Sequence, residues 1–210
     1  MKRAITVFCL AAALCGLTLR GGQVDLGISV ADGRLRSFYV AVGDHYRVAP
    51  RVVVDLRDRY GLRDEELPLV LFLAARAHVA PRAVIDLRLG RMSWLDIALR
   101  LRLSPEIFFL PVAAERIGPP YGKAYGYYRK HGRAGDWGRV VLSDREVVDL
   151  VNLRFMSEYH GLEPEAVIAL RGGGRSFVAI HDELGRRKGE GPPGRGPKGG
   201  RPGKAKDKKK

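Results

Sequence analysis

The chain has 210 residues and a net charge of +14, and this charge is concentrated near its two ends. Residues 186–210 hold 11 Lys or Arg against 2 acidic residues, a net charge of +9, and residues 1–22 add three basic residues and no acid. The other 23 basic and 21 acidic side chains lie in residues 23–185, for a net charge of +2. This distribution excludes a uniformly basic surface. The 163 residues between the two ends fit one domain with its own core.

The N-terminus has the pattern of a secretory signal peptide over residues 1–22. Two basic residues precede an uncharged apolar run, residues 4–19, which is shorter than the roughly 20 residues needed to span a bilayer. We expect export to the periplasm or the cell exterior, with cleavage near Gly22 or nearer Gly16, and no stable transmembrane span afterwards. An uncleaved N-terminal membrane anchor is the first alternative. A buried first helix of a cytosolic protein is the second.

Both cysteines, Cys9 and Cys15, lie within this N-terminal segment. A mature chain without the segment would have no cysteine. The fold must then depend on its hydrophobic core and not on disulfide bonds.

Residues 23–45 carry the pattern of a β-hairpin. Two runs with alternating apolar residues, 23–31 and 35–43, flank Asp32 and Gly33, and Asp-Gly is a preferred dipeptide of tight hairpin turns. A two-stranded hairpin alone would be unstable. We therefore predict a hairpin that packs on the rest of the domain.

Three segments open with proline and continue with apolar residues at helical spacing, which predicts helices that begin at Pro50, Pro81 and Pro164. Proline loses nothing at the first helical position, because that N–H has no partner within the helix. Two further helix starts are predicted at the acidic residues 64–66 and at the capping box of Ser143 with Glu146.

One order of helices occurs twice, over residues 62–103 and again over residues 142–185. At a constant offset of 83, residues Ser93, Trp94, Ile97 and Leu101 align with Ser176, Phe177, Ile180 and Leu184. Two copies of a helical unit usually stack to share a core. The predicted fold is mainly α, with one helical module over residues 46–110, a second over 142–185, and a connector over 111–141.

The connector is rich in Gly and Pro, which argues against a helix over residues 111–139, and it mixes aromatic rings with cations. Such rings can stack on sugars or bases, and the cations can hold phosphate or carboxylate groups. Alternatively, the rings seal the seam between the two modules, with each hydroxyl bonded to the backbone. Both interpretations stay open. The possible ligand surface consists of Tyr121, Tyr125, Tyr127, Tyr128, Arg129 and Trp137.

The C-terminal segment, residues 186–210, contains seven Gly, four Pro and almost nothing apolar. Such a segment buries too little surface to offset the entropy of ordering, so we predict that it is disordered. A flexible polycation attracts polyanions with an affinity that depends on salt. The expected contacts to a polyanion are Lys204, Lys206, Lys208, Lys209 and Lys210.

The sequence predicts no catalytic residue, no cofactor and no metal site. The five histidines form no His-x-His or HExxH pattern, and neighbours on a helix such as His181 and Asp182 point about 100° apart. His78 and His160 are predicted to end the two long helices, where an imidazole interacts favourably with free carbonyls. The glycines at 172–174 lack the Gly-Lys-Ser/Thr of a nucleotide loop and are predicted to be a connector.

The stretch SWLDIALRLRLSPEIF, residues 93–108, resembles the helix-turn-helix of bacterial transcription regulators. The resemblance implies a capped helix, a turn at Ser104, and a second helix opened by Pro105 that enters the major groove. The sequence departs from that pattern because residues 107–110, IFFL, offer no side chain that reads bases.

The leading hypothesis is an exported, non-enzymatic envelope protein, a helical scaffold whose polycationic tail contacts an anionic polymer or a protein partner. The first alternative is a cytosolic nucleic-acid-binding protein that uses residues 93–108 and the tail. The second alternative is a glycan-acting hydrolase centred on residues 118–139, for which Glu115 and Asp136 are the only carboxylates near the aromatic residues.

Overall fold

The computed structural model describes residues 33–113, 117–131, 135–187 and 189, and the regular structure within these residues is helical. The predicted mainly α fold class is confirmed. The α-helices are α1 (Gly33–Tyr46), α2 (Pro50–Tyr60), α3 (Leu67–Ala77), α4 (Pro81–Leu89), α5 (Trp94–Arg100), α6 (Gly122–Lys130), α7 (Asp144–His160), α8 (Pro164–Gly172) and α9 (Phe177–Arg187). Short 3₁₀ turns are η2 (Asp64–Glu66), η3 (Pro105–Phe108) and η5 (Trp137–Arg139).

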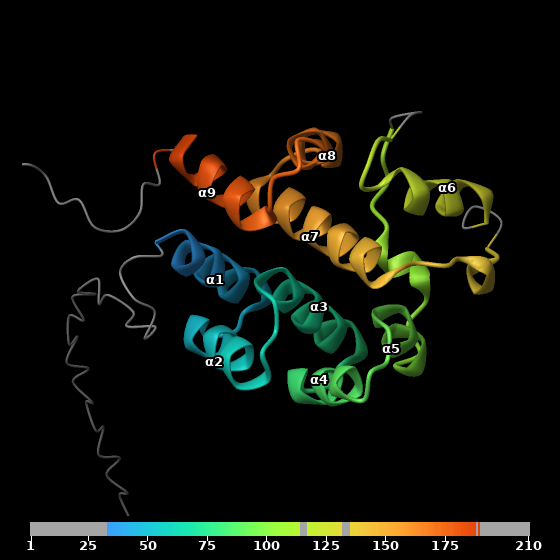
Figure 1. The fold of residues 1–210 in the computed structure, drawn as a ribbon, viewed down its shortest axis with the longest axis horizontal. Coiled ribbons are helices and arrows are strands. Elements are labelled where there is room, and N and C mark those ends of the chain that lie inside the picture. The colour runs from blue at the N-terminus through green and yellow to red at the C-terminus, as the bar shows by residue number, and fades with distance from the viewer. Residues whose placement is uncertain (1–32, 114–116, 132–134, 188, 190–210) are drawn as a thin grey trace, which may run out of the picture.

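Helices α3 and α7 lie side by side at the centre of the body (Figure 1). Helix α3 is buried from Leu67 through Ala74, and α7 also packs against α1, α5, α8 and α9. A helix that is apolar on all sides must be covered on all sides, and α3 is such a helix. Around this pair lie α1, α2, α4, α5, α8 and α9.

Four of the predicted helix starts are confirmed, and the fifth, at residues 64–66, is the 3₁₀ turn η2 that leads directly into α3. Helices α2, α4 and α8 begin at Pro50, Pro81 and Pro164. Helix α7 begins with the predicted capping box, in which the Ser143 Oγ accepts the Glu146 N–H and Glu146 accepts the Ser143 N–H. These local signals hold because each satisfies, or removes, an N–H without an intrahelical partner.

The predicted β-hairpin is wrong for the part that the structure describes, because residues 33–46 form helix α1. Phe38 and Val42, one helical turn apart, are fully buried. The Phe38 ring packs edge-on against Phe155 of α7, with ring centroids 5.8 Å apart. Packing of one helical face against the core overrides the β propensity of these residues. Residues 23–32 lie outside the described residues.

The expectation of a non-helical connector is wrong for residues 122–130, which form α6. Tyr121, Tyr125 and Tyr128 follow one another at helical spacing and face the body, which offsets the cost of about 1 kcal/mol for a glycine inside the helix. Gly122 has a specific role, since a Cβ there would lie 2.5 Å from the Ile117 carbonyl oxygen.

The structure does not support a division into two stacked modules. The buried side chains of the described residues form one hydrophobic core, to which helices of both predicted modules contribute. Helix α9, for example, packs on α1 and α7 together. The boundary of the predicted disordered tail also moves, because Arg186 and Arg187 are helical and pair with Asp182 and Glu183. The rest of the tail lies outside the described residues.

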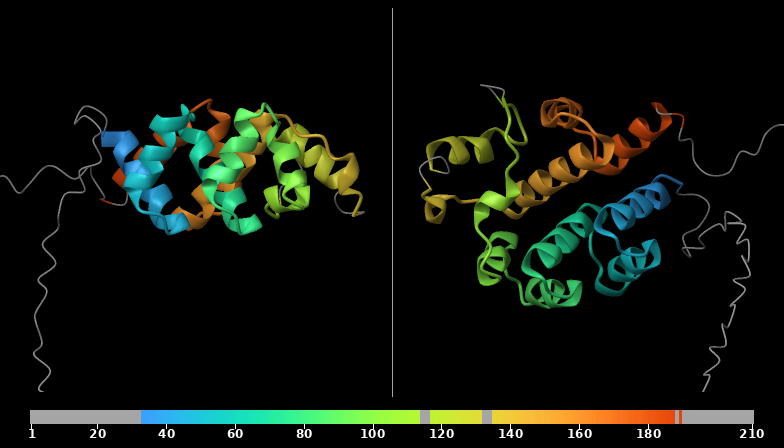
Figure 2. Two further views of the ribbon diagram at one scale, coloured as in Figure 1. Left: turned by 90° about the horizontal axis from the view of Figure 1, so that it is seen from below. Right: turned by 180° about the vertical axis from the view of Figure 1, so that it is seen from behind.

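The N-terminal end of α1 and the C-terminal end of α9 lie at the same end of the body, and α6 lies at the opposite end (Figures 1 and 2). Within the described residues, no single helix is long and apolar enough to cross a membrane. The sharply bent pair Asp64–Ala77 and Pro81–Leu89 meets the criteria of length and composition jointly, and its first helix is buried in the core.

Candidate functional site

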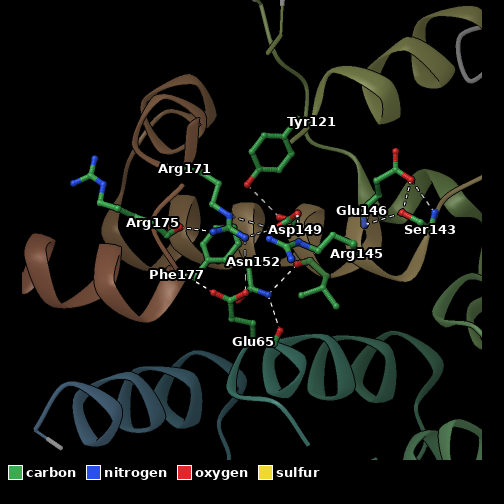
Figure 3. Close-up of polar contacts among 11 residues, drawn as sticks. Glu65, Tyr121, Ser143, Arg145, Glu146, Asp149, Asn152, Arg171, Arg175 and Phe177 are labelled. Carbon is green, nitrogen blue, oxygen red and sulfur yellow. Dashed lines mark hydrogen bonds and ion pairs between the residues drawn. The ribbon is translucent and has the colours of Figure 1, made fainter. Parts of the chain in front are cut away.

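A buried ion pair joins α8 to α7 within a network of polar contacts (Figure 3). Arg171 and Asp149 are 5% and 1% exposed, and Arg171 donates through Nε and Nη2 to Asp149 Oδ1 at 3.2 and 2.9 Å. Arg145 approaches the other carboxylate oxygen at 3.4 Å. Charges this deep are tolerated only when they are paired and hydrogen-bonded.

The same guanidinium also fixes the start of α9. Arg171 Nη1 donates to the Arg175 carbonyl, and its Cζ lies 4.8 Å from the centroid of the Phe177 ring. The Phe177 N–H, the first of α9, donates to Glu65 Oε1 at 2.7 Å, and Glu65 Oε2 lies 3.9 Å from Arg171 Nη2. Glu65 belongs to η2, so this contact ties α9 to the beginning of α3.

Two neutral side chains complete the buried network (Figure 3). Asn152 Nδ2 donates to the Glu65 carbonyl at 2.7 Å and to the Val148 carbonyl at 2.9 Å. The Tyr121 hydroxyl reaches the Asp149 carbonyl at 3.4 Å, and burial raises the pKa of Tyr121 well above its usual value. The network therefore links η2, α7, α8, α9 and the residue before α6 through one buried centre.

A second set of contacts has the same form at the start of α5. Arg88 Nη1 donates to the Met92 carbonyl at 2.9 Å, and Cζ lies 4.7 Å from the Trp94 ring centroid. The Trp94 N–H donates to Asp144 Oδ1 at 2.8 Å, and Asp144 also pairs with Arg88 at 2.7 Å. Arg88 and Arg171 thus connect the ends of α4 and α8 to the aromatic residue that starts the next helix.

A surface pocket of about 480 Å³ lies beside the buried network. Its walls come from the first turn of α1, from η2 and the residue before it, from the first two turns of α7, and from the start of α9. The lining residues are Arg34, Leu35, Arg63, Asp64, Glu65, Arg145, Val148, Ser176, Val178 and Ala179. The volume is in the range of small-molecule sites, and three of the lining side chains are arginines.

The two acids of the pocket are bonded to donors outside its lining. Asp64 Oδ1 accepts the Tyr39 hydroxyl at 2.5 Å and Arg57 Nε at 2.9 Å. Burial, and after it the hydrogen bond to Asp64, raises the pKa of Tyr39. Glu65 is held by the Phe177 N–H and by the nearby Arg171. Neither acid therefore depends on the arginines of the pocket for its partner.

Sequence reasoning missed a buried pair of histidines from α7 and α9. His160 Nε2 lies 3.0 Å from His181 Nδ1, and His181 Nε2 lies 3.0 Å from the Ser37 Oγ of α1. Both imidazoles are at least 95% buried. His160 is the last residue of its helix, as predicted, but it also contacts His181, a residue 21 positions away, for which the sequence has no local signal. Within the described residues no group of three or more potential metal ligands occurs.

The predicted aromatic surface divides into a buried and a half-buried part. Tyr121 and Tyr125 are 1% and 2% exposed, and the Tyr125 hydroxyl donates to the Leu110 carbonyl at 3.0 Å. Tyr128 and Trp137 are half-buried and surround the Phe109 ring, with centroids 4.9 and 6.0 Å from it. These four rings pack on the hydrophobic core of the body.

Tyr127 and Arg129 are the more accessible members of this set. Tyr127 is half-buried and stacks on His131, with centroids 6.5 Å apart, and Lys123 lies 6.0 Å from its ring. Arg129 is exposed. The structure thus does not bring all six predicted residues to one surface. The predicted tail contacts, Lys204, Lys206, Lys208, Lys209 and Lys210, lie outside the described residues.

The segment that resembles a helix-turn-helix contains one helix only. Its second element, η3, is a 3₁₀ turn of four residues, and Pro105 and Phe108 are buried in it. Trp94, Ile97 and Ala98 of α5 are buried as well. Residues 93–108 therefore place several apolar side chains in the hydrophobic core. The sequence pattern alone does not distinguish such a segment from a helix-turn-helix.

Comparison with known proteins gives no relative from which a function could be carried over: no family model, no curated protein and no solved structure matches this chain.

Proposed function

We propose that the chain is an exported, non-enzymatic binding protein whose C-terminal segment contacts an anionic polymer of the cell envelope. In this proposal the helical body acts as a scaffold, and the N-terminal segment acts as the export signal. The alternative ligand is a protein partner with an acidic surface, which would bind the same basic segment.

The observation that carries the proposal is the separation of charge along the chain. Residues 186–210 have a net charge of +9, whereas residues 23–185 have a net charge of +2. Concentrated positive charge on a chain rich in Gly and Pro binds polyanions by releasing their counterions, with little dependence on exact geometry. Such an element needs no catalytic group.

The arrangement of the body supports the same proposal. Helix α9 ends at Arg187, the second residue of the basic segment, and that end lies at the same end of the body as the start of α1 (Figures 1 and 2). The buried contacts of Arg171, Glu65 and Phe177 fix α9 to the core. A ligand held by the segment would therefore be attached to a rigid part of the molecule.

The test is retention of the mature protein, with its tail intact, on a column of immobilised dextran sulfate that is eluted by a salt gradient. One variant replaces five tail residues, Lys204, Lys206, Lys208, Lys209 and Lys210, with Gln. We expect its affinity at about 0.1 M salt to fall by about tenfold or more, with a smaller slope of log affinity against log salt. The helical circular dichroism should stay unchanged.

The matched control removes the same number of charges from the body. It replaces exposed basic residues outside the tail with Gln: Arg51, Arg59, Arg91, Arg100 and Lys130. We expect the control to elute close to the unmodified protein. Equal loss of retention in both variants would show that net charge alone determines binding, and it would contradict a specific role for the tail.

A further inference from the structure

We propose that the pocket between α1, η2, α7 and α9 binds a small organic anion, with a carboxylate or phosphate head group and a short apolar body. This site is separate from the proposed contact of the tail with a polymer. It is formed by residues of the helical body alone.

The arginines that line the pocket keep N–H donors for a ligand. Among the described residues, Arg34 is exposed and makes no ion pair, and Arg145 donates only through Nε, to Asp149. Arg63 uses Nη2 for Glu66 at 2.9 Å. The Nη groups of Arg145 and the whole guanidinium of Arg34 are therefore available, and guanidinium groups match the planar geometry of carboxylate and phosphate oxygens.

The acids in the pocket do not cancel this preference for an anion. Asp64 is held by Arg57 and Tyr39, and Glu65 is held by the Phe177 N–H beside Arg171. Each carboxylate oxygen that accepts these bonds is already satisfied without the pocket arginines. Arg34 has no acidic partner in the pocket, so an anionic head group would be its natural counterion.

The rest of the lining sets the size and chemistry of the ligand body. Leu35, Val148, Val178 and Ala179 contribute an apolar wall, and Ser176 contributes one hydroxyl. A pocket of about 480 Å³ with a few convergent polar groups and apolar walls suits a small molecule and not a polymer chain. Burial of the apolar part adds to binding, while the head group provides orientation.

The test is isothermal titration calorimetry of the mature protein, with its tail intact, against four probes: benzoate, phenyl phosphate, inorganic phosphate and neutral benzyl alcohol. We expect benzoate or phenyl phosphate to bind at least tenfold more tightly than inorganic phosphate and benzyl alcohol. No binding of either organic anion at about 10 mM would overturn the proposal. Binding of benzyl alcohol as tight as that of benzoate would overturn it too.

Variants locate the site. Arg34→Gln alone should weaken binding of the organic anion several-fold, and Arg34→Gln with Arg145→Gln should weaken it by tenfold or more. Arg51→Gln with Arg59→Gln removes two exposed charges of α2 that do not line the pocket, and it should leave the affinity unchanged. Equal weakening in this control, or full affinity in the pocket variant, would contradict the assignment. Urea unfolding of each variant verifies that its fold is intact.

The variant with five tail lysines replaced by Gln separates the two proposals. It should bind the organic anion as the unmodified protein does, even though its retention on dextran sulfate falls. Loss of anion binding in that variant would show that the tail, and not the pocket, holds the small anion.

Discussion

Glu65 and Phe177 are 112 residues apart, yet the Glu65 carboxylate accepts the first N–H of α9 at 2.7 Å. The same relationship joins Asp144 to the Trp94 N–H of α5 at 2.8 Å. In each case the acid lies at the beginning of a central helix, and the donor begins a helix from the other part of the chain. These contacts cap a helix and fix long-range packing at the same time, because a carboxylate at a helix N-terminus stabilises it.

Glu65→Ala should lower the free energy of unfolding by about 2 kcal/mol, because the half-buried Phe177 N–H loses a charged acceptor and Arg171 loses a neighbouring charge. Urea unfolding followed by circular dichroism measures this change. Asp58→Ala, an exposed acid on α2, is the control and should change stability by less than about 0.5 kcal/mol. Equal effects of the two substitutions would contradict the capping role of Glu65.

Arg171→Met should be more damaging, with a loss of about 3 to 5 kcal/mol, because it leaves the buried Asp149 carboxylate without its main partner. Arg88→Met removes the similar contact at α5, but Arg88 and Asp144 are 25% and 34% exposed, so water can replace the missing charge. We expect a loss of about 1 kcal/mol there. A loss at Arg88 as large as that at Arg171 would show that burial is not what sets the cost.

A double substitution distinguishes the ion pair from simple packing. Arg171→Met with Asp149→Leu removes both charges, so the combined loss should be well below the sum of the two single losses. Additive losses would mean that Arg171 and Asp149 stabilise the fold independently of each other.

Glu66 should make the fold sensitive to acid. Burial raises the pKa of Glu66, but hydrogen bonds from the Arg63 side chain and backbone outweigh burial, and the pKa lies below its usual 4.5. The unfolded chain therefore binds a proton before the folded chain does. The stabilisation is present above pH 4.5 and is lost as the pH falls through the lowered pKa. Glu66→Gln should flatten the fall of stability with acid, measured by urea unfolding from pH 7 down to pH 3.

Tyr125→Ala should cost about 3 kcal/mol, because the ring is buried against Phe109 and its hydroxyl donates to the Leu110 carbonyl. Tyr127→Ala should cost about 1 kcal/mol or less, since that ring is only half-buried. Thermal unfolding of both variants gives the comparison. A small effect at Tyr125 would instead favour the ligand-surface interpretation of these tyrosines.

The local features of the fold could be predicted from the sequence because their causes are local. Pro50, Pro81 and Pro164 favour a helix start whatever packs around them, and the capping box at Ser143 depends only on residues of its own first turn. The hairpin predicted over residues 35–43 is wrong because β-branched and aromatic residues also fit a buried helical face once α7 and α9 are present to cover it.

The candidate site could not be predicted, because it is made by long-range contacts. Arg171 and Asp149 are 22 positions apart, and the lining of the pocket comes from four separate segments of the chain. The offset of 83 did align Trp94 with Phe177, each of which lies under an arginine at the start of a helix, but it gave no indication of the acids that accept their N–H groups. The helical spacing of Tyr121, Tyr125 and Tyr128 was a usable signal that the neighbouring glycines obscured.

The most direct test of the account begins with the cell envelope, isolated at low salt from cells that make the protein. The protein is then eluted from the envelope with high salt, and the intact mass of the eluted chain is measured. The account predicts a form that lacks about 20 N-terminal residues and leaves the envelope only at high salt. A full-length chain recovered from the cytosol would contradict export, and with it the proposed binding to an envelope polymer.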